Sequence, residues 1–387
     1  MLRSTPTFLM LKVLYICDPN STHNLQWIGD GKYVEPFLLA NNETRGVSGE
    51  PEEHFARSNI HYLGKIPLFS LVRFWRTLAT IRFIKKMVGR HKIDLIHILF
   101  AEPEALWVLA KSYFGVPMVV TTRGTDILKT IPSFFQRKDL LGRAVAQLYR
   151  WAFARTDAVT STSLSQQQSL EKIMPGITTE KILIRTGIDL EQVEMEASGQ
   201  VPFPTDKPYC LFPRMMKPLY NHEFAIEAIS KLPPEIRSGY RFVFVHRDAP
   251  DREYVEKIEG LMEEASADFL FLDLLTPSGL HAAIKSAALT VMTPKSDGSS
   301  VTVAVCLYLK CPVLVPPLDY DEDIFANGIN MFEHWESSCL ANAMESILSG
   351  ESSAKPEAGR LDVATHFDRA KEMARLRELY YRLTGRG

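Results

Sequence analysis

The sequence has few cysteines, and they form no metal-binding or disulfide pattern. Cys17, Cys210, Cys306, Cys311 and Cys339 are scattered along the chain, and several lie in apolar runs. This distribution excludes a small domain held together by disulfides and a cysteine-based zinc site. It predicts buried free thiols in a reducing compartment.

The chain also lacks a hydrophobic run long enough to cross a membrane, since none approaches the ~20 residues of a spanning helix. The first residues contain one arginine and no long apolar region before Lys12. We therefore expect no signal peptide and a cytoplasmic protein.

A strong net charge is absent as well, but the total of −2 hides two halves of opposite sign. Residues 1–190 hold 24 Lys and Arg against 16 Asp and Glu, a net of +8. Residues 191–387 hold 20 against 30, a net of −10. This asymmetry, in a chain of 387 residues, indicates two domains with different partners.

Short apolar runs alternate with helix-like segments along the whole chain. The strand-like runs are 12–16, 60–63, 95–100, 118–122, 158–161, 182–185, 209–212, 242–245, 269–272, 289–292 and 313–315. Continuous apolar runs of this kind are typical of parallel strands that are covered on both faces. The pattern predicts an α/β protein.

Residues 195–208 interrupt the alternation with the Pro- and Gly-containing composition of a linker. We therefore expect two Rossmann-like domains, residues 1–195 and 196–367, whose parallel sheets face each other across a cleft. A charged amphipathic helix, 368–387, is expected to pack back on the first domain. Ligands of such sheets bind beyond the carboxyl ends of the strands, so the cleft is the expected site.

Residues 294–317 carry the most chemical information. An apolar run ends at Pro294, a polar loop with Asp297 and Gly298 follows, and a helix-length apolar segment starts at Val301. Backbone N–H groups around Gly298, Ser299 and Ser300 would then lie at a helix N-terminus, which attracts anions. An acid beside such a site can accept hydrogen bonds from hydroxyl groups, so a phosphorylated sugar or a nucleotide is the expected ligand.

Five segments, in this order, resemble motifs of the retaining family-4 glycosyltransferases (glycosyl transferases group 1), which have the two-Rossmann GT-B fold. They are 119–127, 184–189, 214–228, 297–313 and 327–330. The resemblance covers most of the chain and implies an enzyme that transfers a hexose from a nucleotide sugar to a glycan, lipid-linked or other envelope acceptor. It also implies polysaccharide biosynthesis, retention of configuration, no cofactor and no metal ion.

The resemblance implies a role for each matching residue. Arg214, with Lys217 nearby, would neutralise the diphosphate leaving group, and Asp297 would orient the donor sugar. The remaining donor-binding residues that we expect are Arg247, Gly298, Ser299, Ser300 and Thr302. Arg123, Asp126 and Glu102 follow strand ends in the first half and are the expected acceptor contacts. For His97 a place in the core or cleft lining is favoured over catalysis, and for Glu104 a helix N-terminal charge.

Some positions depart from the family pattern. The second glutamate of the Glu-x7-Glu motif is replaced by Val305, the usual histidine by Arg123, and the family lysine by Leu219 or Tyr220. Donor variation explains these changes, but so does loss of activity. Two alternatives therefore stay open: an inactive GT-B homologue that acts as a binding protein, and another GT-B enzyme such as a sugar epimerase or phosphorylase.

Residues 73–86 interleave five cations with apolar and aromatic residues and contain no acid. An ordinary surface helix would account for them. Such helices also bind anionic lipid, which predicts a peripheral position on the inner face of the plasma membrane. We find no nucleic-acid-binding motif and expect no nucleic-acid partner.

Overall fold

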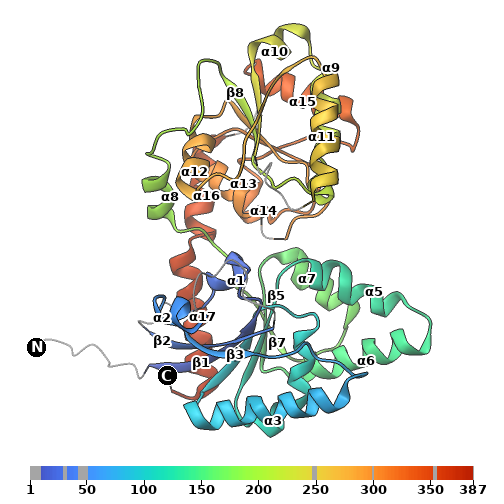
Figure 1. The fold of residues 1–387 in the computed structure, drawn as a ribbon, viewed down its shortest axis with the longest axis vertical. Coiled ribbons are helices and arrows are strands. Elements are labelled where there is room, and N and C mark those ends of the chain that lie inside the picture. Colours follow the sequence, from blue (N-terminus) through green and yellow to red (C-terminus); the bar gives the residue numbers. More distant parts are fainter. Residues whose placement is uncertain are drawn as a thin grey trace, which may run out of the picture. The chain divides into compact units, whose positions relative to one another are not determined.

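A computed structural model describes residues 10–28, 33–41, 51–245, 251–298, 300–351 and 355–386. The chain divides into two compact units (Figure 1). Unit 1 comprises Met1–Thr186 and Lys371–Gly387, and unit 2 comprises Gly187–Ala370. Each unit is built around its own parallel sheet with helices on both faces. The α/β fold with two Rossmann-like domains, predicted from the alternating pattern, is confirmed.

The sheet of unit 1 has seven parallel strands in the order β3-β2-β1-β4-β5-β6-β7. The strands are β1 (Leu11–Cys17), β2 (Val34–Ala40), β3 (His61–Lys65), β4 (Leu95–Ile98), β5 (Met118–Thr122), β6 (Ala158–Ser161) and β7 (Glu180–Leu183). The order reverses between β1 and β4. Polar loops at this reversal are the usual ligand site of doubly wound sheets.

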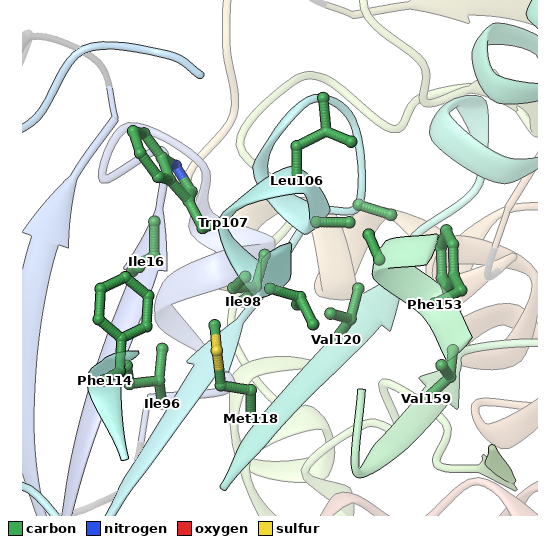
Figure 2. Close-up of a cluster of buried hydrophobic side chains, with 14 of the residues drawn as sticks. Ile16, Ile96, Ile98, Leu106, Trp107, Phe114, Met118, Val120, Phe153 and Val159 are labelled. Carbon is green, nitrogen blue, oxygen red and sulfur yellow. The ribbon is translucent and has the colours of Figure 1, made fainter. Parts of the chain in front are cut away.

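Helices cover this sheet on both faces because successive strand residues point in opposite directions. Leu14 and Ile16 of β1 join one buried cluster, whereas Val13 and Tyr15 join another. The first cluster packs under η1 (Glu104–Ala110) and the helices that follow β3 and β5, and Figure 2 shows Trp107 and Phe153 close to the strand residues there. The helical elements of unit 1 are α1 (Thr22–Leu25), α2 (Pro51–Ala56), α3 (Phe74–His91), η1 (Glu104–Ala110), α4 (Lys111–Phe114), η2 (Asp126–Thr130), α5 (Ile131–Gln136), α6 (Leu140–Arg155), α7 (Leu164–Ile173) and α17 (Arg369–Thr384).

The last helix of the chain, α17, belongs to unit 1 although unit 2 precedes it (Figure 1). Leu376, Leu379 and Tyr380 are buried in the second cluster with Val13 and Tyr15. The Arg185 N–H donates to Glu372 Oε2 at 2.8 Å, which fixes the first turn of the helix. Unit 1 is therefore completed by residues from the far end of the sequence.

The sheet of unit 2 has six parallel strands in the order β10-β9-β8-β11-β12-β13. They are β8 (Tyr209–Phe212), β9 (Arg241–Phe244), β10 (Asp268–Phe271), β11 (Leu289–Val291), β12 (Val313–Val315) and β13 (Asn330–Met331). The order reverses between β8 and β11, so unit 2 repeats the topology of unit 1. Its helical elements are α8 (Leu190–Glu196), η3 (Pro218–Tyr220), α9 (His222–Lys231), α10 (Pro234–Gly239), α11 (Arg252–Glu264), α12 (Pro277–Ser286), α13 (Val301–Tyr308), α14 (Glu322–Phe325), α15 (Ser337–Leu348) and α16 (Pro356–His366).

The linker-like residues 195–208 do not mark the boundary between the units. The first unit ends at Thr186, and α8 with the loop that follows it belongs to unit 2. Val193, Ala197 and Phe203 are buried in the core of unit 2, which holds this polar segment against its own domain. The expected ranges 1–195 and 196–367, with 368–387 added to the first, differ from the two units only at residues 187–195 and 368–370.

Two expectations from composition concern side chains and helices. All five cysteines are free, and all except Cys339 are buried. Within the described part of the chain, no helix is both long enough and apolar enough to span a membrane.

Candidate functional site

Arg214 and Asp297 lie at the topological reversal of unit 2. Arg214 follows β8, and Asp297 follows β11 in the neighbouring position of the sheet. Because parallel strands end at the same edge, the two loops meet there. Both residues were predicted to belong to one donor site, and in the structure they are in contact.

The Arg214 guanidinium is held on three sides. Nη2 donates to Asp297 Oδ2 at 2.8 Å, and Nη1 donates to Thr302 Oγ1 at 3.3 Å. The ring of Tyr220 lies 4.8 Å from the Cζ atom, within the range of a cation–π contact. Burial lowers the pKa of Arg214, but the charge and hydrogen bond of Asp297, together with the nearby Tyr220 and Tyr320, more than offset it, so the net shift is upward. The guanidinium stays charged in the folded protein.

The loops that carry this pair are tied together by backbone contacts. The Lys295 N–H donates to the Leu219 carbonyl at 2.9 Å, and the Thr293 hydroxyl donates to the Tyr220 carbonyl at 2.8 Å. His222 Nε2 is hydrogen-bonded to the Arg214 carbonyl at 3.2 Å. These contacts fix the positions of both charged side chains relative to each other.

Two polar atoms beside the pair are buried without a hydrogen-bond partner among the described residues: Nε of Arg214 and the hydroxyl of Tyr320. Burial raises the pKa of Tyr320, and the nearby charge of Asp297 raises it further. A buried donor without an acceptor is unfavourable, and a ligand oxygen can satisfy it. Neither Tyr320 nor the cation–π contact of Tyr220 was predicted from the sequence. Tyr320 comes shortly after β12 and therefore lies at the same sheet edge, which is the signal that could have identified it.

The other expected donor-binding residues lie near this pair or outside the description. Ser300 is the N-cap of α13, with a left-handed backbone (φ 46°), and Thr302 is in the first turn of the helix. Gly298 directly follows Asp297 in the same loop. Lys217 is exposed, at the start of η3. Arg247 and Ser299 lie outside the described residues.

Val305 lies in the core of unit 2, with a relative exposure of 4%. Its neighbours in the buried cluster include Met292 and Val303. A side chain at this position does not reach solvent, so a ribose has no access to it. Val305, which replaces the second glutamate of the family motif, is therefore an apolar residue that packs in the core in this chain.

Asp126 is fully buried in unit 1 and contacts backbone. Its carboxylate accepts N–H groups from Ala101, Arg123, Gly124 and Ile127 at 2.8–3.2 Å. Burial raises its pKa, and these backbone hydrogen bonds oppose the shift. Asp126 thus joins the loop after β4 to the loop after β5, and its oxygens face the protein.

Arg123 lies at the same edge of the sheet of unit 1, and its guanidinium group is only partly hydrogen-bonded. Nε donates to the Leu99 carbonyl at 3.2 Å, and Cζ lies 4.5 Å from the ring of Trp27. Nη2 is buried without a partner among the described residues. Burial lowers the pKa of Arg123 to about 10, so the side chain is charged at neutral pH and can bind an anionic or hydroxyl-bearing group.

Glu102 and Glu104 follow β4 and differ in environment. Glu102 is half-buried, and burial raises its pKa. Glu104 has a relative exposure of 1%, and burial raises its pKa to about 8. Its Oε1 accepts the side-chain amide of Asn41, whereas Oε2 has no partner among the described residues. Glu104 opens η1 as expected, but it is buried and predominantly neutral at pH 7.

His97 is fully buried in β4. Nδ1 is hydrogen-bonded to the Tyr380 hydroxyl, and Nε2 to the Thr121 hydroxyl at 2.6 Å. Burial holds its pKa well below the ordinary value. Both nitrogens are occupied by protein groups, in agreement with the core position favoured from the sequence. His97 links β4, β5 and α17.

Residues 10–28, 33–41, 51–245, 251–298, 300–351 and 355–386 contain no group of three His, Cys, Asp or Glu side chains in a metal-binding arrangement.

Comparisons with known proteins find a family match in the first part of the chain. Residues 34–192 match the model of Glycosyltransferase Family 4. No curated protein sequence matches the chain.

Solved structures resemble the chain over nearly its whole length. A glycosyltransferase from Rickettsia africae ESF-5 has a TM-score of 0.75 at 14% identity and covers 97% of this chain and 99% of its own. Sucrose-phosphate synthase from Thermosynechococcus elongatus has a TM-score of 0.72 at 14% identity, with 97% and 100% covered. Anabaena HepE in complex with UDP-glucose has a TM-score of 0.68 at 13% identity, with 95% and 99% covered.

At such identities the structures establish the fold, and the family match covers most of the first unit. Residues 34–192 match the Glycosyltransferase Family 4 model, and the chain as a whole has the GT-B fold of the glycosyltransferases.

Proposed function

We propose that the protein is a retaining, metal-independent hexosyltransferase that uses a nucleotide-sugar donor. One observation carries the proposal: Arg214 and Asp297 form a fixed ion pair at the topological reversal of unit 2, beside the N-terminus of α13. The two side chains are 20% and 12% exposed, so water screens the pair weakly. HepE, whose fold this chain shares, has been solved with UDP-glucose, which supports a donor of that class.

In the proposed reaction the bond from the anomeric carbon to the diphosphate breaks, and a bond to an acceptor hydroxyl oxygen forms. The departing diphosphate takes up the acceptor proton. Arg214 stabilises the charge that develops on the diphosphate, and its unpartnered Nε is available for a phosphate oxygen. The Tyr320 hydroxyl is a second donor beside it.

Asp297 has two tasks in this proposal. It holds the guanidinium in place through Oδ2, and its carboxylate can also accept hydroxyl groups of the hexose. Gly298, Ser299 and Ser300 would contribute backbone N–H groups, and Lys217 and Arg247 additional charge. Positioning and charge stabilisation of this kind need no protein nucleophile.

We assign the acceptor to unit 1, where Arg123 has an unpartnered Nη2 and Glu102 is half-exposed. The proposed acceptor is a glycan or a lipid-linked envelope saccharide, and the proposed location is the cytoplasmic face of the plasma membrane. Asp126 contributes by holding the two acceptor loops together.

One observation favours an alternative, a binding protein without transferase activity. Val305 supplies no acid for the ribose, so the ribose needs backbone partners or remains in water. Incubation with a panel of UDP-, GDP-, ADP- and CMP-sugars separates the two functions. Release of nucleotide, with an anomeric configuration in the product that matches the donor, supports the transferase, and EDTA should leave the rate unchanged. Binding of a nucleotide sugar without any turnover supports the alternative.

A further inference from the structure

Unit 1 exposes five large hydrophobic side chains in one short segment, which we call the apolar tip. Its members are Leu68, Leu71, Val72, Phe74 and Trp75. Val72 is 97% exposed and Trp75 is 81% exposed. Single exposed hydrophobic residues are common, but a contiguous group of this size marks a surface that contacts an apolar partner.

The apolar tip lies in a sequence segment without acids, residues 54–93. Glu53 and Asp94 are the nearest acidic residues on either side. Arg73 and Arg76 are exposed within the tip, and Arg82 and Lys86 are exposed further along α3. In the part of the chain that the structure describes, none of these four cations forms an ion pair, so their charge is available to an anionic surface.

The structure refines which part of the 73–86 helix is available. Thr77, Thr80 and Ile84 are buried against unit 1. Lys85, one of the five cations, donates to the Phe114 carbonyl at 2.9 Å and is used within the protein. The exposed surface is therefore the tip and the outer cations of α3, and not the whole helix.

The apolar tip is fixed to the edge where the proposed acceptor residues lie. It follows the carboxyl end of β3, and the Thr77 hydroxyl donates to the Ser70 carbonyl at 2.7 Å. Phe69 packs edge-on against Trp107, with ring centroids 5.1 Å apart. Trp107 belongs to η1, which begins at Glu104. The tip and the Glu102–Glu104 loop are thus neighbours within unit 1.

We propose that the apolar tip and the outer cations of α3 dock on an anionic lipid bilayer and present the adjoining sheet edge to a lipid-linked acceptor. Tryptophan and phenylalanine insert at the boundary between headgroups and acyl chains, and the cations bind the negative surface. Residues 54–93, which include the tip and α3, contain no acid that would repel that surface. Only the statement about the acceptor rests on the proposed transferase function, because docking itself requires no catalysis.

The test is flotation of the full chain with vesicles of phosphatidylcholine alone or with added phosphatidylglycerol, at low and high salt. The wild-type protein should float only with anionic vesicles, and less so as salt increases. Arg73→Gln with Arg76→Gln should lower the partition coefficient roughly 30-fold, at about 1 kcal/mol per cation. Val72→Ser with Trp75→Ser should lower it at least about tenfold.

Matched controls are Lys129→Gln with Lys138→Gln, two exposed cations of unit 1, and Trp151→Ser, a half-exposed tryptophan on α6. These should float like the wild type. Equal flotation with neutral vesicles, no flotation, or equal loss in the controls would overturn the docking proposal. So would a wild-type oligomer that the tip variant converts to monomer without any vesicle binding, because the tip would then be a contact between copies.

The acceptor statement is tested separately, with anionic vesicles added to a transferase assay that uses a soluble sugar acceptor. In a second arm, lipid-linked saccharide extracts in those vesicles replace the soluble acceptor. If the wild type turns over donor, but the tip variant and the wild type transfer sugar to these extracts at equal rates, the acceptor statement is wrong while the transferase function stands.

Discussion

At Glu104, burial and hydrogen bonding act on one carboxyl group in opposite directions. Burial raises its pKa, the hydrogen bond from the Asn41 amide lowers it by a smaller amount, and the net value is about 8. The folded state therefore binds the proton more tightly than the unfolded chain, whose ordinary pKa is 4.5. By linkage, stability is greatest below pH 4.5 for this group and decreases as the pH rises through 8.

Glu104→Gln should abolish this contribution. We expect the melting temperature of the wild type to fall between pH 5 and pH 9 by more than that of the variant, by an amount worth a few kcal/mol at pH 9. The pKa values of Glu102 and Asp126 are also raised, so the difference between the two proteins is the relevant quantity. Exposed Glu256 provides the control substitution, Glu256→Gln. Parallel pH profiles for Glu104→Gln and the wild type would contradict the assignment.

At the scale of single elements, the packing of α13 shows that Val305 is a core residue. The helix packs its residues from Val303 to Tyr308 into the core of unit 2. Val305→Glu buries a carboxylate without a partner, and the variant should lose several kcal/mol of stability and gain no affinity for nucleotides.

Val305→Thr is the control, because it keeps the shape and replaces one methyl group by a hydroxyl. Thermal unfolding of both variants, with and without nucleotide, measures the difference. A stable Val305→Glu protein that binds nucleotide more tightly would show that this position faces the ligand.

The elements that the sequence predicted best are the buried parallel strands. Met118–Thr122, Ala158–Ser161, Tyr209–Phe212 and Val313–Val315 were predicted with their observed bounds, because each is a continuous apolar run between polar loops. Strand β2 was missed, since Glu35 and Pro36 interrupt its apolar pattern. Helix α3 begins only at Phe74, so Leu68, Leu71 and Val72 of the apolar tip precede the helix.

The donor site was predictable only in part. Arg214 and Asp297 follow apolar runs that are predicted strands, so the sequence predicts that both lie at the carboxyl edge of the sheet of unit 2. The partners that complete the site, Tyr220 and Tyr320, depend on how loops cross that edge. In unit 1, the four backbone contacts of Asp126 could not be inferred from the sequence, because they come from two loops far apart in the chain.

At the scale of the whole molecule, unit 1 depends on the last helix of the chain. Leu379 of α17 is 3% exposed and packs in a cluster with residues of β1 and β5. Leu379→Ala should destabilise unit 1 by about 2–5 kcal/mol. Hydrogen exchange should then accelerate in β1 and β5 and change little in β8 and β11.

Leu361→Ala is the control, since Leu361 lies on α16 of unit 2 and is 66% exposed. Equal acceleration in the strands of both units would mean that the two units unfold as one, and selective acceleration in unit 2 would contradict the assignment of α17 to unit 1.

The central claim is that unit 2 binds a nucleoside diphosphate or its sugar through Arg214, and direct titration tests it. UDP, GDP, ADP, CMP and their sugars are titrated against the wild type, Arg214→Ala and the exposed control Arg252→Ala. At least one nucleoside diphosphate or its sugar should bind the wild type and the control equally. Arg214→Ala should weaken that binding roughly 10- to 100-fold, as expected for a charged hydrogen bond of about 1.5–3 kcal/mol. Absence of binding across the panel, or undiminished binding by Arg214→Ala, would contradict the account.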